Sequence, residues 1–175
     1  IEASSISSAY IYEIKNTLSK FKAQVFIVAG NHDYISLASY YLDEDWPSNT
    51  HIFKTDQVEK VYIEDLNTCV YGASFVSSYQ RQGQLDHDFN LNKDLINIGI
   101  FHGDAIFQTD DLYNTISRME IANSGFNYLA LGHIHKKSGL LKEGKTLFSY
   151  PGSPVSLGFF EQGPRGVLLL DLDKT

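Results

Sequence analysis

The sequence contains little cysteine, little proline and no long apolar run. Cys69 is the single cysteine among 175 residues, which excludes an internal disulfide and a thiolate-rich zinc site. No apolar run approaches the roughly 20 residues that a membrane-spanning helix needs, and the first residues lack the charged-then-apolar pattern of a secretion signal. These absences predict a soluble protein of a reducing compartment, the cytoplasm, with no membrane attachment.

Basic residues are also scarce. The chain has 14 Lys and Arg against 21 Asp and Glu, a formal charge of −7. This balance argues against a protein that grips nucleic acid with a broad basic face, because phosphate neutralisation needs clustered Lys and Arg. A polyanionic substrate would have to be held locally. Bound divalent cations can do this, because they reverse the sign of the charge that a phosphate meets.

What the chain does have is enough apolar material for one core. Its hydrophobic content is 43%, and no internal repeat, low-complexity tract or linker divides it, so residues 1–175 are predicted to form a single domain. The chain begins at Ile1 rather than at a methionine. We therefore expect it to be truncated at its N-terminus.

The hydrophobic pattern predicts a mixed α/β fold. Helical spacing of apolar residues predicts helices at 5–21, 36–42 and 112–122. Apolar or alternating runs predict strands at 25–29, 51–53, 58–63, 68–71, 95–101, 128–131, 138–141, 146–150 and 166–172. The three runs between 51 and 71 are predicted to be antiparallel, and residues 77–92 are predicted to form a long surface loop.

Four of the six histidines directly follow predicted strands. They lie in Gly30-Asn31-His32-Asp33, in Phe101-His102-Gly103-Asp104 and in Gly132-His133-Ile134-His135. Ligands collect at the carboxyl ends of strands in open α/β sheets, so these three turns are predicted to converge on one metal site. The other two histidines, at positions 51 and 87, have polar neighbours in the sequence and are predicted to face solvent.

Each motif offers different chemistry. His133 and His135 lie two residues apart, so an extended backbone would point both imidazoles to one side and Ile134 to the other. The Asn31 amide oxygen is a neutral, hard ligand, and an imidazole followed by a carboxylate, as at His32, can serve as a general acid. Taken singly, each motif also fits a turn cap or a strand end with an ordinary histidine. Their joint occurrence favours a metal site.

The three motifs together resemble the later motifs of the calcineurin-like metallophosphoesterases. Those motifs run Gly-Asn-His-Asp/Glu, then a lone His, then Gly-His-x-His, and they correspond to residues 25–33, 98–104 and 128–135. A Pro-Gly-Ser-Pro turn within 150–155, followed by Phe160-Glu161, is similar to the SbcD-type DNA repair exonuclease branch. The resemblance implies a sandwich of two mixed β-sheets flanked by helices, here lacking its first strands.

The resemblance also implies roles for single residues. Asn31, His102 and His133 would bind the second of two divalent metal ions, and His135 would bind the first. His32 would protonate the leaving oxygen, with Asp33 orienting it. The favoured metal is Mn, with Mg, Fe or Zn as alternatives. The implied substrate is DNA, and the implied partners are a second copy of the chain and an SbcC-type ATPase.

The sequence departs from the family before Gly30. The family's Asp-x-His and Gly-Asp-x-x-Asp motifs, which supply anionic ligands, do not occur there. The ligand set that remains is neutral, so metal binding is predicted to be weak and confined to one ion, and the segment as given to be inactive. Asp104 is a candidate substitute ligand. Two alternatives stay open: a hydrolase of small phosphoesters or phosphoproteins, and a non-catalytic binding scaffold with an incomplete metal site.

Overall fold

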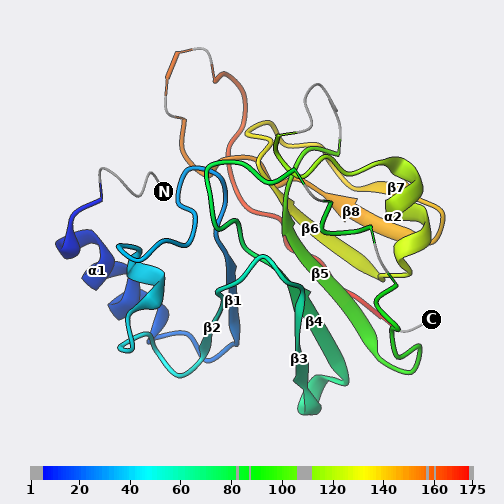
Figure 1. Ribbon diagram of the computed structural model, residues 1–175, viewed down its shortest axis with the longest axis horizontal. Helices are drawn as coiled ribbons and strands as arrows, with labels where there is room; N and C mark the ends of the chain where they lie inside the picture. Colours follow the sequence, from blue (N-terminus) through cyan, green and yellow to red (C-terminus); the bar gives the residue numbers. More distant parts are fainter. Residues whose placement is uncertain are drawn as a thin grey trace.

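The computed structural model describes residues 6–81, 83–86, 88–105, 112–156, 158–159 and 161–173. It contains a six-stranded sheet of order β3-β4-β5-β6-β8-β7 and a two-stranded sheet, β1-β2. Figure 1 shows the two-stranded sheet and helix α1 to the left of the six-stranded sheet, and helix α2 at its right. The predicted fold class, mixed β-sheets flanked by helices, is confirmed.

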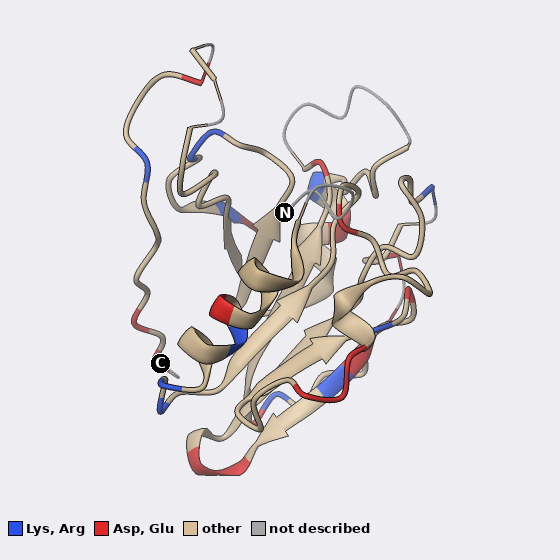
Figure 2. Ribbon diagram, turned by 90° about the vertical axis from the view of Figure 1, so that its left-hand side faces the viewer, with Lys and Arg blue, Asp and Glu red and all other residues tan. Residues whose placement is uncertain are grey.

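The strands are β1 Val25–Val28, β2 Thr50–Phe53, β3 Glu59–Ile63, β4 Thr68–Gly72, β5 Ile96–His102, β6 Tyr128–Gly132, β7 Leu141–Glu143 and β8 Thr146–Ser149. The helices are α1 Ser8–Leu18 and α2 Arg118–Ser124, with short 3₁₀ turns η1 Tyr40–Leu42 and η2 Glu64–Leu66. Figure 2 shows that the strands are largely free of charged residues. None of the helices described is long and apolar enough to cross a bilayer.

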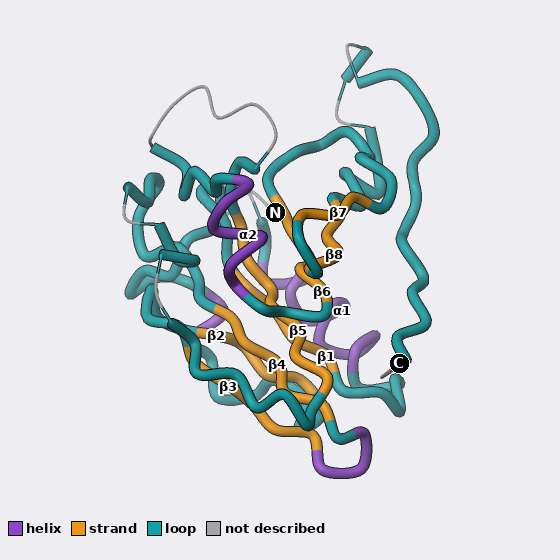
Figure 3. The backbone as a smooth tube through the Cα atoms, turned by 90° about the vertical axis from the view of Figure 1, so that its right-hand side faces the viewer, coloured by secondary structure: helices purple, strands orange, loops and turns teal. Residues whose placement is uncertain are grey.

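The four central strands of the large sheet, β4, β5, β6 and β8, run parallel, and β3 and β7 pair antiparallel at its edges. Alternate residues of β5 are buried, as expected when one face of a strand lies on the main core. That core includes Phe101, Leu129 and Tyr150, and α2 covers it with the fully buried Ile121. Figure 3 views this side of the molecule, where α2 lies against β7 and β8.

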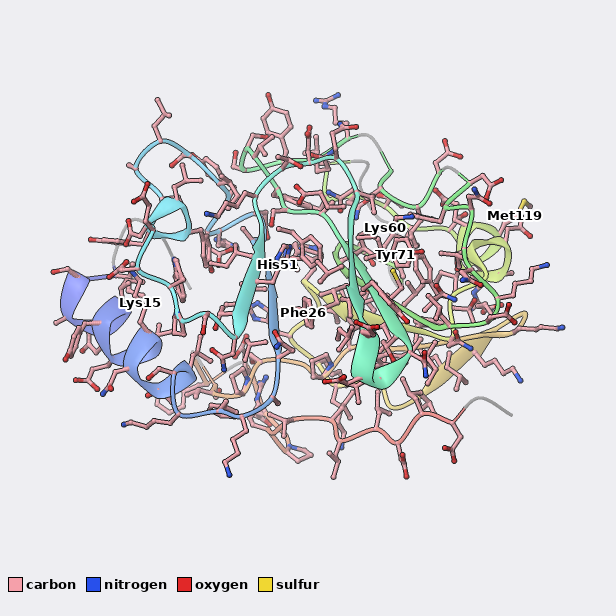
Figure 4. All side chains as sticks on the ribbon, turned by 90° about the horizontal axis from the view of Figure 1, so that it is seen from below. Lys15, Phe26, His51, Lys60, Tyr71 and Met119 are labelled. Carbon is pink, nitrogen blue, oxygen red and sulfur yellow. The ribbon has the colours of Figure 1, made fainter. Side chains whose placement is uncertain are left out.

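The two-stranded sheet lies between the large sheet and a second, smaller core. On one of its faces Phe53 is fully buried and so close to Gly72 of β4 that a Cβ there would lie 2.5 Å from the Phe53 ring. On the other face Ile52 packs with Tyr41. His51 pairs in register with Phe26, and Figure 4 labels both residues on the two neighbouring strands. His51 is half-buried and its Nε2 is enclosed, so the prediction that it faces solvent is wrong; residue 87 lies outside the described residues.

Helix α1 is attached to the rest of the fold by a buried lysine. Lys15 is 9% exposed, and its ammonium group donates to Asp43 at 2.7 Å and to Asp45. It also lies 5.1 Å from the centre of the Trp46 ring. Burial of the aliphatic part of a lysine is favourable when its charge is paired in this way. The loop that follows η1 therefore holds α1 in place.

The predicted helix at 112–122 forms only in its second half, because two local features oppose its start. Asn114 is fully buried with φ of +49°, and its side chain donates to the backbone oxygen of His102 at 2.8 Å and to Gln84 at 3.0 Å. This conformation cannot continue a right-handed helix. Ser117 then caps α2, with its side chain accepting from the Glu120 amide in a capping box.

Four other strand and helix predictions need correction. Strand β2 pairs parallel with β1 rather than antiparallel with its successors. The helix at 36–42 is reduced to the 3₁₀ turn η1, and the strand predicted at 138–141 begins at Leu141. Residues 166–172 form no strand, since Val167 and Leu169 are 85% and 97% exposed and none of the described strands pairs with this segment. Apolar alternation alone does not make a strand without a partner.

Tyr150, which directly follows β8, is hydrogen-bonded to the turn that follows His102. Its fully buried hydroxyl donates to the backbone oxygen of Gly103 at 2.7 Å and accepts from the Ala105 amide at 2.8 Å. Replacing Tyr150 with Phe leaves both backbone groups buried without this partner. We expect a loss of about 1–3 kcal/mol in the free energy of unfolding, measured by urea titration. Tyr12→Phe, at an exposed tyrosine, is the control and should change stability little; an equal effect of both variants would contradict this account.

Candidate metal centre

The predicted site residues are brought together by the register of the strands. Strands β5 and β6 are parallel neighbours, and His102, the last residue of β5, lies opposite Gly132, the last residue of β6. Strand β1 packs against β5 and ends two residues before Gly30. The carboxyl ends of three strands therefore meet, as the sequence predicted, and each is followed directly by its polar motif.

Asn31 and His102 make direct contact across this junction. Nε2 of His102 lies 2.8 Å from Oδ1 of Asn31, a hydrogen bond in which the imidazole donates to the amide oxygen. Two ligands of one divalent ion, each bound at about 2.1 Å and at right angles, are separated by about 3 Å. The observed spacing of these two atoms therefore suits a shared ion, which would replace the hydrogen bond when the proton of His102 lies on Nδ1 instead.

Two glycines make room for the His102 ring. A Cβ at Gly30 would lie 2.5 Å from His102 Cε1, and a Cβ at Gly132 would lie 3.1 Å from His102 Nδ1. The imidazole therefore sits between the ends of β1 and β6. A residue larger than glycine at position 30 or 132 would displace it. Phe75 holds a third side of the ring, in edge contact with a centroid distance of 5.2 Å. The position of His102 is fixed by packing as well as by its hydrogen bond.

His133 stands beside His102 in an unusual backbone conformation. The two ring centres are 5.1 Å apart, and the Tyr113 ring lies 5.2 Å from His133 on another side. The φ angle of His133 is +99°, a region that residues with a side chain rarely adopt. Such strain persists only where the surrounding structure enforces it, and it concentrates at functional sites.

The imidazoles of His102 and His133 are kept neutral. Burial, together with the charges of His133, His32 and His135, lowers the pKa of His102 to about 3. Burial also lowers the pKa of His133; the nearby carboxylate of Asp104 opposes this, while His135 and His32 add to it. These mutual effects place all four imidazoles within electrostatic reach of one another. A neutral imidazole keeps the lone pair that a metal ion needs.

His32 and Asp33 have different surroundings, although they are neighbours in the same turn. His32 is exposed at the mouth of the site. The Asp33 carboxylate instead accepts from the Gly30 amide at 2.8 Å and from the Tyr41 hydroxyl at 2.6 Å, so it shapes the turn that presents Asn31. Burial, with Asp33 beside it, raises the pKa of Tyr41. Asp33 thus contacts Tyr41 rather than His32, and its orienting role stays a prediction. Sequence reasoning missed Tyr41, whose apolar neighbours carried no signal of this contact.

Two residues of the C-terminal segment, Glu161 and Arg165, contact His135. Nδ1 of His135 lies 2.5 Å from Oε1 of Glu161, whose side chain is only 8% exposed. Arg165 lies 3.5 Å from the other oxygen of Glu161 and donates to the backbone oxygen of His135 at 2.9 Å. The Ser153 amide donates to that same oxygen at 3.1 Å. With Nδ1 engaged, only Nε2 of His135 is left for a metal ion, the arrangement found in carboxylate–histidine–metal triads.

The ligand atoms of Asn31, His102 and His133 suit a divalent ion, but none of these side chains carries a negative charge. Among the residues that the structure describes, no three His, Cys, Asp or Glu side chains converge tightly enough to hold an ion by themselves. Asn31 and His102 provide the closest pair of donors, with His133 beside them. Asp104 is buried and near His133, so it stays a candidate for the missing charge. An anionic ligand would strengthen binding considerably, because it offsets the charge of the ion.

The chain matches the model of the calcineurin-like phosphoesterase superfamily domain over residues 11–175. The chain belongs to this superfamily. Over 150 residues it is 29% identical to a Bacillus subtilis (strain 168) protein named uncharacterized metallophosphoesterase YhaO, a match that covers 83% of this chain and 36% of that protein. The chain thus spans about a third of the length of this curated relative. Membership supports a metallophosphoesterase-type hydrolase, and the superfamily generally uses divalent metal ions.

The contact between Glu161 and His135 leads to a testable effect on metal binding. Glu161→Gln removes the charge that orients the ring and raises its basicity. In the native gene product we expect the affinity for the ion at His135 to fall by about 10- to 100-fold, measured by titration with Co²⁺ and its absorption spectrum. Glu64→Gln, at an exposed glutamate, changes the net charge equally and should leave the titration unchanged. Identical titrations for the two variants would exclude this role for Glu161.

Proposed function

We propose that the chain carries the metal-binding and proton-donating part of a phosphodiester hydrolase that acts on DNA as a repair-type exonuclease with two metal ions. The observation that carries the proposal is the meeting of Asn31, His102 and His133, with the 2.8 Å contact between the first two, at the ends of three strands. The likeness of the sequence around 128–136 and 150–155 to the SbcD-type branch supports DNA as the substrate.

The residues divide the work as follows. Asn31, His102 and His133 would hold one ion, and Nε2 of His135 would face the other. A bound divalent ion supplies positive charge that polarises the phosphodiester and promotes attack by water. His32, which is exposed, would donate a proton to the oxygen that leaves.

Hydrolysis assays on the native gene product with Mn test this proposal. End-labelled single- and double-stranded DNA and bis-p-nitrophenyl phosphate serve as parallel substrates, with EDTA as the control. We expect release of nucleotides from DNA ends that stops when EDTA is added. Turnover of bis-p-nitrophenyl phosphate without attack on DNA would favour a small phosphoester as the substrate and overturn the exonuclease proposal.

The neutral ligand set favours a second candidate, a binding scaffold that performs no metal chemistry. The described residues provide no tight cluster of three charged or imidazole ligands, which is the observation that supports it. The two candidates differ in metal content. If the purified native gene product retains no Mn after dialysis and hydrolyses neither substrate, the scaffold is the correct interpretation.

A further inference from the structure

A cationic groove lies beside the segment that carries His133 and His135, and residues of that segment line it. It has a volume of about 580 Å³ and lies between the start of α2, strand β7 and the residues that follow β6. Four cationic side chains line it with a single carboxylate: Arg118, Lys136, Lys137, Lys142 and Glu143. The groove therefore holds four of the 14 basic residues of a chain whose net charge is −7.

Most of this positive charge is not neutralised. Arg118 lies 3.5 Å from Glu143, so this pair largely cancels. Lys136, Lys137 and Lys142 are exposed, and no carboxylate in the described part of the chain pairs with them. Three like charges along one groove repel one another and raise the local concentration of anions. In a protein that is acidic elsewhere, this local contrast directs a polyanion to this face.

The groove adjoins the metal centre. Ile134, which lies between the two histidines of the third motif, lines the groove. Lys136 and Lys137 line it too, and they also line a second cavity of about 390 Å³ that contains His135 and Glu161. The two lysines thus form a ridge shared by both cavities. A polyanion bound at His135 would therefore have the lysines of this ridge within reach.

We propose that this groove binds the phosphate backbone of a single-stranded nucleic acid whose reacting phosphodiester lies at the metal centre. The inference rests on the proposed function, since the same polymer would occupy both places. A small phosphoester has no further phosphates to reach the lysines. Apolar side chains, those of Ile134, Leu141 and Phe148, line the groove beside the lysines, and such surfaces bind the exposed faces of unpaired bases, which a duplex keeps stacked inside. The groove therefore selects single-stranded ends of DNA or RNA through charge rather than base sequence.

Binding to a fluorescein-labelled oligothymidylate, measured by anisotropy in EDTA, tests the groove without any hydrolysis. The triple variant Lys136→Gln, Lys137→Gln and Lys142→Gln is compared with Lys20→Gln, Lys22→Gln and Lys60→Gln, which removes the same charge from exposed positions outside the groove. We expect the groove variant of the native gene product to bind about tenfold more weakly at low salt. Its slope of log affinity against log salt should be smaller by about 2, while the control keeps both values.

The outcomes separate the groove from the proposed hydrolase. If both triple variants weaken binding equally, the groove proposal is overturned, whatever the enzyme hydrolyses. If poly-glutamate displaces the oligothymidylate as well as unlabelled oligothymidylate does, the groove is a site for acidic polypeptides and the proposal is again overturned. Loss of binding confined to the groove variant supports it. Failure of the native gene product to hydrolyse either DNA or bis-p-nitrophenyl phosphate with Mn counts against the hydrolase alone.

Discussion

Alanine at His133 or at Asn31 in the native gene product will abolish Mn-dependent hydrolysis, with a loss of about 10³-fold or more, and will also remove bound metal. The reason is the small number of donors at this site. Asn31 and His102 already stand at the spacing of two ligands of one ion, with His133 beside them. Loss of either a neutral oxygen or a neutral nitrogen leaves too few groups to hold the ion, and several kcal/mol of charge stabilisation are lost with it.

His32→Ala is the matched variant in this experiment, because it lies in the same turn but is assigned to proton transfer. We expect turnover to fall by about 10²- to 10⁴-fold while the metal content stays at the wild-type value. Metal is measured by mass spectrometry after dialysis, and thermal unfolding verifies that each variant is folded. Equal loss of metal in His32→Ala, His133→Ala and Asn31→Ala would refute the division of roles.

A single methyl group at Gly30 will disrupt the same site without removing any ligand. A Cβ at this position would lie 2.5, 2.6 and 2.8 Å from three atoms of the His102 ring, well inside van der Waals contact. The ring would have to swing away and lose its 2.8 Å contact with Asn31. We expect Gly30→Ala to weaken Mn binding by about 100-fold or more, as displaced metal ligands do, and to cost about 1–3 kcal/mol of stability.

The control for this substitution is Gly166→Ala. A Cβ at Gly166 would have no described atom within 4 Å, and the φ angle there is not positive, so the added methyl group meets open space. Its Mn affinity and unfolding midpoint should equal those of the wild type. Wild-type Mn affinity in Gly30→Ala would show that the His102 ring is not held where the structure places it.

The sequence predicted the site better than the connections around it. Residues 25–29, 95–101 and 128–131 are apolar runs that end in polar motifs, so both the strands and the chemistry at their ends were visible locally. The orientation of β2 could not be predicted from the local sequence, because its partner β1 lies about 25 residues away and nothing in residues 51–53 specifies a parallel neighbour. A strand at 166–172 was predicted from alternation, but none of the described strands pairs with it.

Contacts between distant residues account for the remaining differences. Asn114 prevents the first half of the predicted helix at 112–122 through bonds to residues that are 12 and 30 positions away. Glu161 reaches His135 across 26 residues, and Asp33 contacts Tyr41 rather than its neighbour His32. Each of these side chains is common in turns and loops, where its partner cannot be inferred from local pattern. Only Glu161, a carboxylate in a glycine- and proline-rich segment, stood out in the sequence as a possible partner for a site residue.

Crystals of the native gene product soaked in Mn, with anomalous scattering data, give the most direct measurement of the metal centre. We expect two anomalous peaks, one at coordination distance, about 2.0–2.3 Å, from Oδ1 of Asn31 and from one ring nitrogen each of His102 and His133, and a second at that distance from Nε2 of His135. Anomalous density elsewhere on the protein, with Asn31 and His102 still bonded directly to each other, would contradict this expectation.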